Sequence, residues 1–245
     1  MMENLLELRE ATFSAQDRNI IHGISVVFNE GRTTAIVGPS GGGKSTVLKM
    51  AAGLLLPNEG EALYKGKNIA HMNRDENLEF RKESAFVFQD SALWANQDLF
   101  QILELPLKIH YPAMRKKERA QRIKEVTELV GYRKDLDIRP SRLSMGEQKL
   151  IAFARALLCS PDLLYLDEWT ESLDETAGDR LINIVRRMQK EDVTVLFVCH
   201  DMRIIRILAD FVIVIVDGKI AVHATKEQVE NDPELSNYLR MGMAL

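Results

Sequence analysis

A glycine-rich loop between an apolar run and a helical run constrains the fold of this chain more than any other feature. Residues 38–46 have the sequence GPSGGGKST, which satisfies the pattern G-x-x-x-x-G-K-[ST]. The apolar run TTAIV at 33–37 precedes the loop, and a helical pattern at 44–56 follows it. Because glycines let such a loop curl, its N–H groups and the helix N-terminus converge on a phosphate. This order predicts an α/β nucleotide-binding core.

Each residue of the loop is a predicted ligand of a nucleoside triphosphate. We expect Lys44 to reach the β- and γ-phosphates and Ser45 to ligate Mg²⁺. The loop alone does not separate kinases, GTPases, helicases and transport ATPases. The residues predicted to bind the nucleotide, which the family resemblance described below implies is ATP, are Gly38, Pro39, Ser40, Gly41, Gly42, Gly43, Lys44, Ser45 and Thr46.

The composition fits a soluble globular protein and excludes two classes. The 245 residues are 46% hydrophobic, which is enough for a sizeable core. A formal charge of -4 argues against a protein that grips nucleic acid through its phosphates, so we expect no nucleic-acid partner. The longest apolar stretch, 211–216, is far shorter than the roughly 20 residues of a membrane-spanning helix. We expect no secretion signal in MMENLLELRE, and Cys159 and Cys199 suit a reducing cytosol.

Apolar runs and helical patterns divide the chain into a core and an insertion. Runs that are apolar at both alternating positions predict strands buried on both faces, at 85–88, 163–166, 193–198 and 211–216. Helical patterns lie at 115–130, 176–189 and 202–208. The turn signal PNEG at 57–60 is expected to end the helix that starts at 44. Pro106, Pro112 and Pro140 are expected to break helices.

We therefore predict a P-loop NTPase fold of the α/β class. It has a mostly parallel sheet and a helical insertion, and the family resemblance described below implies an N-terminal antiparallel β region as well. The predicted boundaries are 1–89 and 159–230 for the nucleotide-binding core, 90–158 for the helical subdomain, and 231–245 for a C-terminal tail.

Polar residues follow two of the predicted core strands. Asp167 and Glu168 end the run LLYLDE, and His200 follows LFVC. Asp167 is placed to reach Mg²⁺, and Glu168 can polarise a water for in-line attack on the γ-phosphate. His200 fits a contact to the same phosphate.

These motifs, in this order, resemble the ATP-binding subunits of ABC transporters over almost the whole chain. The resemblance implies that Phe13 stacks on adenine and that Gln89, in FVFQD, contacts Mg²⁺ and the catalytic water. It also implies that the signature LSMGE at 143–147 presents Ser144 and Gly146 to the γ-phosphate bound by a second subunit. The catalytic set implied by the family is Lys44, Gln89, Glu168 and His200, and its Mg²⁺ ligands are Ser45, Gln89 and Asp167.

Three residues depart from the family pattern. Met145 and Glu147 replace a glycine and a glutamine of the usual signature, and Trp169 stands where proline is common. None of these changes removes a catalytic group. A bulky side chain and a negative charge near the triphosphate are expected to weaken closure of the dimer.

The resemblance also implies partners. Two copies of the chain would enclose two ATP molecules, and a separate permease would carry the substrate. The permease would dock beside Gln89, where Trp94 and Phe100 are our candidate contacts. This places the chain on the cytoplasmic face of a bacterial inner membrane as a peripheral protein.

Short phrases resemble the ATPases of bacterial Mce/Mla-type lipid transporters in particular. They are FQDSALWAN at 88–96, LELPL at 103–107 and NDPELSNYLRMG at 231–242. In that subfamily the ATPase drives a permease that moves phospholipid or related lipids through a periplasmic Mce protein. The tail, with Leu235, Tyr238 and Leu239 at helical spacing, is expected to form a helix that contacts either the partner ATPase or its own subunit.

Alternative functions are weighed against the same residues. An importer or exporter of amino acids, metals or another small solute is the main alternative, since the permease contacts the substrate. A DNA-repair or chromosome-organising ATPase would carry a long coiled-coil insert, and a translation-associated one would carry two cassettes. A small-molecule P-loop kinase would leave the signature and the SLD segment at 172–174 unexplained.

Overall fold

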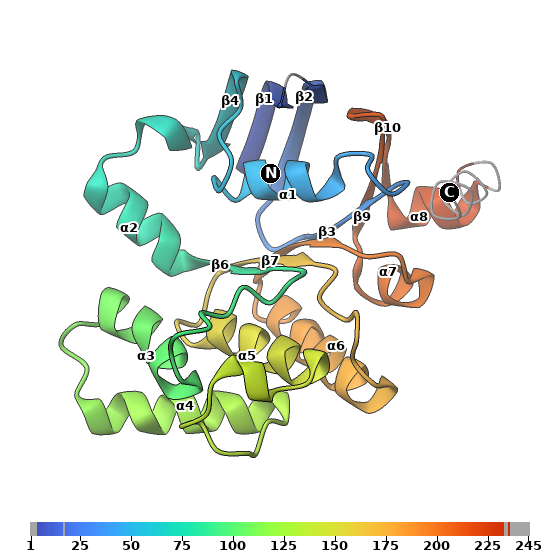
Figure 1. Cartoon of the computed structure of the whole chain (residues 1–245). Coiled ribbons are helices and arrows are strands. Elements are labelled where there is room, and N and C mark those ends of the chain that lie inside the picture. Colours follow the sequence, from blue (N-terminus) through green and yellow to red (C-terminus); the bar gives the residue numbers. More distant parts are fainter. Residues whose placement is uncertain (1–3, 17, 233–234, 236–245) are drawn as a thin grey trace. The chain divides into compact units, whose positions relative to one another are not determined.

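The computed structural model describes residues 4–16, 18–232 and 235, which group into two compact units. Unit 1 comprises residues 1–77 with 189–245, and unit 2 comprises residues 78–188 (Figure 1). Within the described part of the chain, no helix has both the length and the apolar character needed to cross a membrane.

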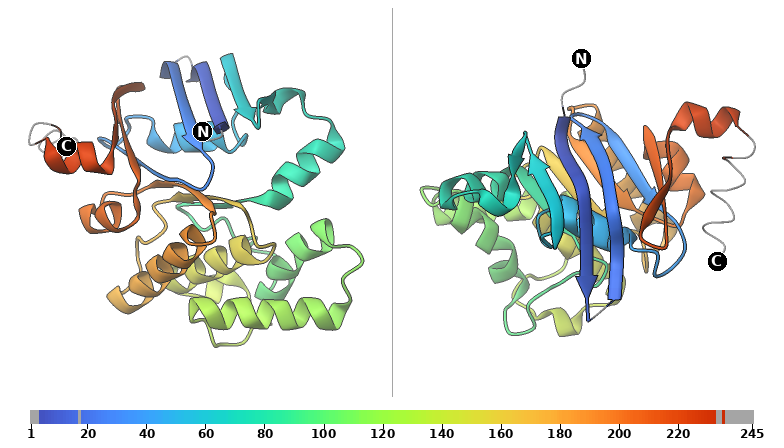
Figure 2. Two further views of the ribbon diagram at one scale, coloured as in Figure 1. Left: turned by 180° about the vertical axis from the view of Figure 1, so that it is seen from behind. Right: turned by 90° about the horizontal axis from the view of Figure 1, so that it is seen from above.

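Unit 1 contains an antiparallel sheet and a mostly parallel group of strands. The antiparallel sheet has the strand order β2-β1-β4-β5, and the second group has the order β10-β9-β3-β8. Figure 2 shows β1 and β2 side by side along their whole length. The elements are β1 (Asn4–Ala15), β2 (Arg18–Asn29), β3 (Thr33–Val37), α1 (Lys44–Ala51), β4 (Glu59–Tyr64), β5 (Lys67–Asn68), η1 (Ile69–His71), β8 (Thr194–Val198), α7 (Met202–Leu208), β9 (Phe211–Val216), β10 (Lys219–Thr225) and α8 (Lys226–Asn231).

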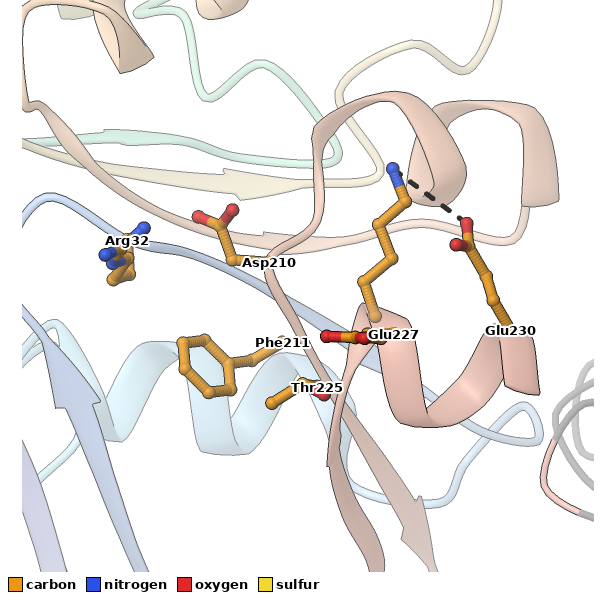
Figure 3. A pocket seen from close by; sticks show the side chains of 7 residues that line it. Arg32, Asp210, Phe211, Thr225, Glu227 and Glu230 are labelled. Atoms are coloured by element: carbon orange, nitrogen blue, oxygen red, sulfur yellow. Dashed lines mark ion pairs between the residues drawn. The ribbon is translucent and has the colours of Figure 1, made fainter. Parts of the chain in front are cut away.

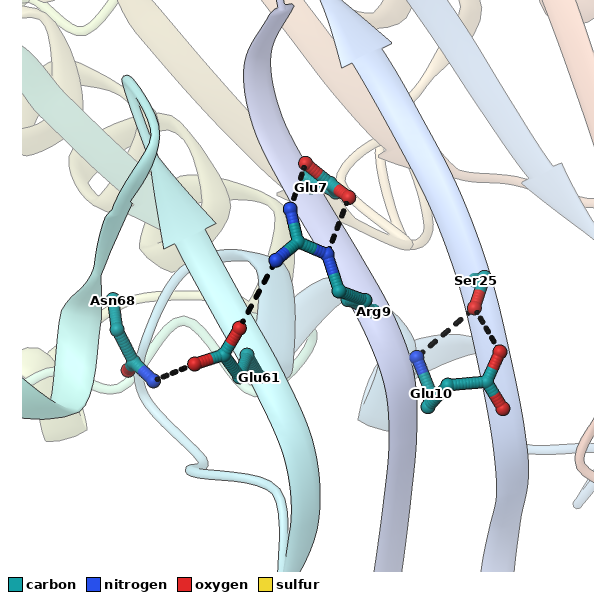
Figure 4. Close-up of polar contacts among 6 residues, drawn as sticks. All are labelled: Glu7, Arg9, Glu10, Ser25, Glu61 and Asn68. Carbon is teal, nitrogen blue, oxygen red and sulfur yellow. Dashed lines mark hydrogen bonds and ion pairs between the residues drawn. The ribbon is translucent and has the colours of Figure 1, made fainter.

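The antiparallel sheet separates apolar from polar side chains. Leu6 and Leu8 of β1 lie opposite Phe28 and Val26 of β2, and all four are buried. Polar side chains on the sheet form two separate groups: Arg9 bonds Glu7 and Glu61, which also accepts from Asn68, and Ser25 bonds Glu10 (Figure 4). This alternation fits a half-buried sheet, whose side chains point to opposite faces in turn.

The parallel strands are buried on both faces. Every residue of β3 and β8 is buried, and β3 runs parallel to both β8 and β9. The carboxyl ends of parallel strands meet at one edge of a sheet, where α/β proteins bind ligands. The loops that follow β3 and β8 therefore open at the same edge.

The helix after the loop is shorter than predicted. It ends at Ala51 instead of continuing to residue 56. Gly53 has the left-handed φ of 59°, and its N–H bonds the carbonyl of Met50 while Leu54 N–H bonds that of Lys49. A glycine in this conformation ends a helix by satisfying its last carbonyls, so the stop precedes the turn signal at 57–60.

Unit 2 contains a parallel strand pair and a group of helices. Strand β6 pairs with β7, and α5 packs against β6, α3 and α4. Helix α2 begins in unit 1 and α6 ends there. The elements are α2 (Arg74–Glu83), β6 (Ser84–Val87), α3 (Leu99–His110), α4 (Lys116–Val130), η2 (Pro140–Arg142), α5 (Met145–Leu157), β7 (Leu163–Asp167) and α6 (Glu175–Gln189).

Pro106 does not break its helix, contrary to the prediction. It lies inside α3, between the fully buried Leu103 and Leu107. Proline removes one N–H donor from the helix ladder. Burial of the apolar residues that flank it, Leu103 and Leu107, favours continuation of the helix at this point.

The predicted α/β class, with an antiparallel N-terminal region and a helical insertion, matches the observed elements. The predicted subdomain boundaries at 90 and 158 fall within unit 2 and stay a prediction. Of the predicted tail helix, Tyr238 and Leu239 lie outside the described residues.

Candidate functional site

The loop after β3 is built to bring backbone N–H groups together. Gly42 N–H bonds the carbonyl of Pro39, and Gly218 N–H bonds that of Gly42, at 3.1 Å each. Gly38 has a φ of 142°, and a Cβ on it would lie 2.0 Å from the carbonyl oxygen of Ile215. No other residue fits there, so the loop keeps its narrow curl.

Lys44 places its ammonium inside this loop. The side chain is buried, and Nζ donates to the carbonyls of Gly38 at 3.0 Å and Pro39 at 2.9 Å. Lys44, Ser45 and Thr46 form the first turn of α1, whose N–H groups point toward the N-terminal end of the helix. A buried cation beside the N-terminal end of a helix suits the phosphates of a nucleotide.

Phe13 and His200 lie near the loop in unit 1. Phe13 is half-buried and pairs with Ile21 across β1 and β2. Ile21 lies beside the loop, because a Cβ on Gly43 would come within 2.6 Å of its side chain. Phe13 is on the strand next to Ile21 and is therefore one strand away from the loop. His200 is exposed two residues after β8, whose carboxyl end shares an edge with that of β3.

Unit 2 gathers Gln89, Asp167 and Glu168 at one end of its strand pair. Val87 pairs with Leu166 in the parallel ladder, so Gln89 and the two carboxylates follow adjacent strands at the same edge. Asp167 is buried and Glu168 is half-buried. Gln89 Nε2 donates to Glu171, three residues beyond Glu168, at 3.2 Å.

Ser144 and Gly146 open helix α5. Ser144 is the N-cap residue, and its hydroxyl accepts a hydrogen bond from Glu147 N–H while Glu147 bonds Ser144 in return. A Cβ on Gly146 would lie 2.9 Å from the carbonyl of Ser172, so this position requires a close approach of two segments. Met145 between them is 72% exposed.

The two permease candidates differ in exposure. Trp94 is 45% exposed, and the Arg155 guanidinium lies over its ring at 5.8 Å. Arg155 also donates to the carbonyls of Ser91 and Ala92, both of which have positive φ. Phe100, in the first turn of α3, is less exposed than Trp94, because it is half-buried. The segment therefore presents Trp94 more strongly than Phe100.

Residues from both units are needed for the predicted nucleotide site. Lys44, Ser45 and His200 belong to unit 1, whereas Gln89 and the acidic pair after β7 belong to unit 2. The joint site that would use them together stays a prediction.

Sequence reasoning did not find Lys134 and Lys149. Lys134 pairs with Glu147 at 2.5 Å, and Lys149 bonds three main-chain carbonyls near Gln89 and Glu168. The residues next to a lysine in the sequence do not show whether its side chain is buried or lies along the protein surface. Neither role could be found without the folded chain.

Unit 1 also has an open groove of about 330 Å³ beside α8 (Figure 3). Three of its charged side chains already have partners within the fold. Lys226 Nζ lies 4.0 Å from Glu230 and bonds the Arg206 carbonyl, and Asp210 accepts from Thr33 N–H. We assign no ligand to this groove.

Comparison with known proteins agrees with these motifs. The profile of the family described as ABC transporter matches residues 21–171. The intermembrane phospholipid transport system ATP-binding protein MlaF of Haemophilus influenzae is 32% identical over 236 residues, covering 96% of this chain and 89% of that protein. The nickel import ATP-binding protein NikE of Shigella flexneri is 33% identical over 210 residues, covering 84% and 78%.

The fold has a solved counterpart of the same kind. The dimeric ATP-binding cassette MJ0796, in a post-hydrolysis state bound to ADP and Pi, superposes with a TM-score of 0.83 and 28% identity. The match covers 90% of this chain and 98% of that one. The predicted resemblance is confirmed: the chain belongs to the ABC transporter family and is an ATPase coupled to transmembrane transport.

Proposed function

We propose that this chain powers lipid transport as the ATPase of an Mce/Mla-type transporter, working as a dimer under a permease at the cytoplasmic face of a bacterial inner membrane. The observation that carries the lipid assignment is the match to a phospholipid-transport ATPase over 96% of the chain. A periplasmic Mce protein would be the further partner.

The chain's own residues supply the steps of hydrolysis. The loop at 38–43 and Lys44 hold the β- and γ-phosphates, and Phe13 stacks on the base. Glu168 accepts a proton from water as the water oxygen attacks the γ-phosphorus and the bond to ADP breaks. Gln89 and His200 orient the water and the γ-phosphate.

Mg²⁺ fits the donors that the chain offers. The Ser45 hydroxyl, the Gln89 amide oxygen and the Asp167 carboxylate are hard oxygen ligands of the kind Mg²⁺ prefers. When bound, the ion neutralises charge on the phosphate oxygens.

The dimer provides the coupling. Ser144 and Gly146 at the start of α5 would contact the γ-phosphate held by the partner's loop. ATP then favours the closed dimer through contacts that exist only there, and hydrolysis removes them. Trp94 would dock the permease, since an exposed aromatic gains from burial against a partner.

The assembled complex tests the lipid assignment. Mass spectrometry of the complex, purified through this chain with its permease, is expected to find bound phospholipid. Trp94→Ala is expected to release the permease without changing the ATP affinity of the isolated subunit. Leu129→Ala, which removes an exposed apolar side chain on α4 instead, is the matched control.

A solute importer is the second candidate, favoured by the match to a nickel-import ATPase at 33% identity. Recovery of a periplasmic binding protein loaded with a metal or an amino acid, and no lipid, would replace the lipid assignment with this one. The ATPase function would stand in either case.

A further inference from the structure

Helix α5 carries a buried lysine that the proposed mechanism does not use. Lys149 is 3% exposed. Its Nζ lies 2.5 Å from the carbonyl oxygen of Gln89, 3.3 Å from that of Glu168 and 3.5 Å from that of Phe88. One ammonium thus contacts the main chain that follows β6 and the main chain that follows β7.

The positive charge of Lys149 is unfavourable in the protein interior and must be compensated by its contacts. Burying an ammonium destabilises the folded state unless strong partners compensate for the lost hydration. Burial lowers the pKa of Lys149, although the carboxylates of Glu171, Asp167, Asp90 and Glu168 act in the opposite direction. The residues that follow in α5, Leu150 and Ile151, are buried and apolar, and a methionine would fill the space of Lys149 without the charge.

The backbone that Lys149 contacts is strained. Glu168 has a φ of 44°, a left-handed conformation that is unfavourable for a non-glycine residue. Such a conformation persists where surrounding contacts hold it. The Lys149 ammonium is one of those contacts, because it bonds the carbonyl of Glu168 itself.

The same ammonium bonds the carbonyl of Gln89, whose side chain donates to Glu171. The two groups proposed to handle the attacking water are therefore fixed by one side chain. That side chain sits in the second turn of the helix that Ser144 caps.

We propose that Lys149 is a positioning residue for hydrolysis, which holds the main chain of Gln89 and Glu168 in register from the signature helix. This inference rests on the proposed role of Glu168 as the base. Lys149 acts on the placement of these groups and not on ATP binding, since its contacts go to carbonyls.

The test is Lys149→Met in the full-length chain, with steady-state ATP hydrolysis and nucleotide binding measured on the folded protein. We expect kcat to fall by about ten- to a hundred-fold, as for a catalytic group displaced by about 1 Å, with KM and ATP affinity unchanged. The melting temperature should stay level or rise, because a buried charge is removed. Lys149→Gln, which keeps an amide donor, should recover part of the rate.

Arg122→Met is the matched control. Arg122 likewise donates to main-chain carbonyls, those of Leu157 and Leu158, but these lie at the far end of α5. We expect this variant to lose stability and to keep its kcat per folded molecule.

Three outcomes decide the matter. A wild-type kcat in Lys149→Met, or a loss of rate that only follows lost ATP affinity or lost folded protein, overturns the inference. A selective fall in kcat that Lys149→Gln partly restores supports it. Hydrolysis at the wild-type rate by Glu168→Gln, which leaves Lys149 intact, would instead remove the proposed base.

Discussion

Glu147, a single residue of the signature, carries a charge that Lys134 neutralises. The Glu147 carboxylate accepts from Ser144 N–H at 2.8 Å and from the Ser144 hydroxyl at 3.0 Å, and it pairs with Lys134 at 2.5 Å. The hydrogen bond from Lys134 holds the pKa of Glu147 below its usual value, with help from Ser144 N–H. Glu147 is therefore ionised at neutral pH, but its charge is balanced.

This pairing changes the expected effect of charge on dimer closure. Lys134→Ala leaves Glu147 unbalanced near the partner's triphosphate, so we expect weaker ATP-driven dimerisation. Met145→Gly with Glu147→Gln removes both the bulk and the charge and should tighten it. Sedimentation in a Glu168→Gln background, where ATP persists, measures both. Equal dimer affinity for Lys134→Ala and the parent would show that this charge pair does not reach the interface.

Trp169 is a core residue in place of the family's proline. It is 0% exposed and stacks on Phe153 at a centroid distance of 5.6 Å. Among the described residues its buried Nε1 has no hydrogen-bond partner. This departure from the family pattern, next to Glu168 in the sequence, therefore has a packing role.

Two substitutions separate the ring of Trp169 from its N–H. Trp169→Ala should lower the free energy of unfolding by about 3–5 kcal/mol, as large-to-small core changes do. Trp169→Phe keeps the stacking on Phe153 and removes a donor without a partner, so it should cost much less. Urea unfolding compares the two. An equal loss in both variants would mean that the indole N–H matters.

Sequence alone identifies those candidate site residues that a short contiguous pattern specifies. The loop at 38–46 and the acidic pair after β7 are of this kind, because neighbours along the chain supply the chemistry. Lys134 and Lys149 act on residues 13 and 60 positions away, respectively, since their partners are Glu147 and Gln89. Such contacts arise from packing, which no local pattern records.

At the scale of elements, Glu104 joins α3 to α4. Its side chain is 7% exposed, accepts from Arg119 at 2.9 Å and pairs with Lys108 at 2.6 Å. Burial raises the pKa of Glu104, but the hydrogen bonds from Lys108 and Arg119 lower it by more. The carboxylate is therefore charged in the folded state at neutral pH.

Glu104→Gln tests this link through its pH dependence. Removing one partner of a buried pair should cost about 3 kcal/mol at neutral pH. Because the folded pKa lies below the unfolded one, the stabilisation is complete above the unfolded pKa and is lost as the pH falls through the folded value. Urea unfolding should show a difference from wild type that shrinks in acid. A difference constant with pH would contradict the pairing, and Glu128→Gln on exposed α4 surface is the control.

Element ends were predicted less well than element types. The strand at 211–216 and the helix at 202–208 match β9 and α7, because strong periodicity specifies them. The helix from 44 ends early at Gly53, and Pro106 stays inside α3. The first difference depends on the hydrogen bonds that the Lys49 and Met50 carbonyls accept. The second depends on the burial of Leu103 and Leu107 beside Pro106.

At the scale of the whole molecule, the residues of the proposed site belong to both units. Unit 1 contains the loop and Lys44, whereas unit 2 contains Gln89, Glu168 and the signature helix α5. The α/β class followed from the alternation of apolar runs and helical patterns along the chain. The transported substrate could not follow, because the permease, and not the ATP-binding unit, would contact it.

The central claim is that Glu168 activates water for hydrolysis of bound ATP. Steady-state phosphate release by wild type and Glu168→Gln, with ATP affinity and dimer mass measured in parallel, tests it most directly. We predict that Glu168→Gln binds ATP normally, accumulates an ATP-bound dimer and loses about 10²–10⁴-fold in turnover. Lys44→Ala should instead weaken binding, since it removes a charge from the phosphates. Turnover by Glu168→Gln at the wild-type rate would contradict the claim.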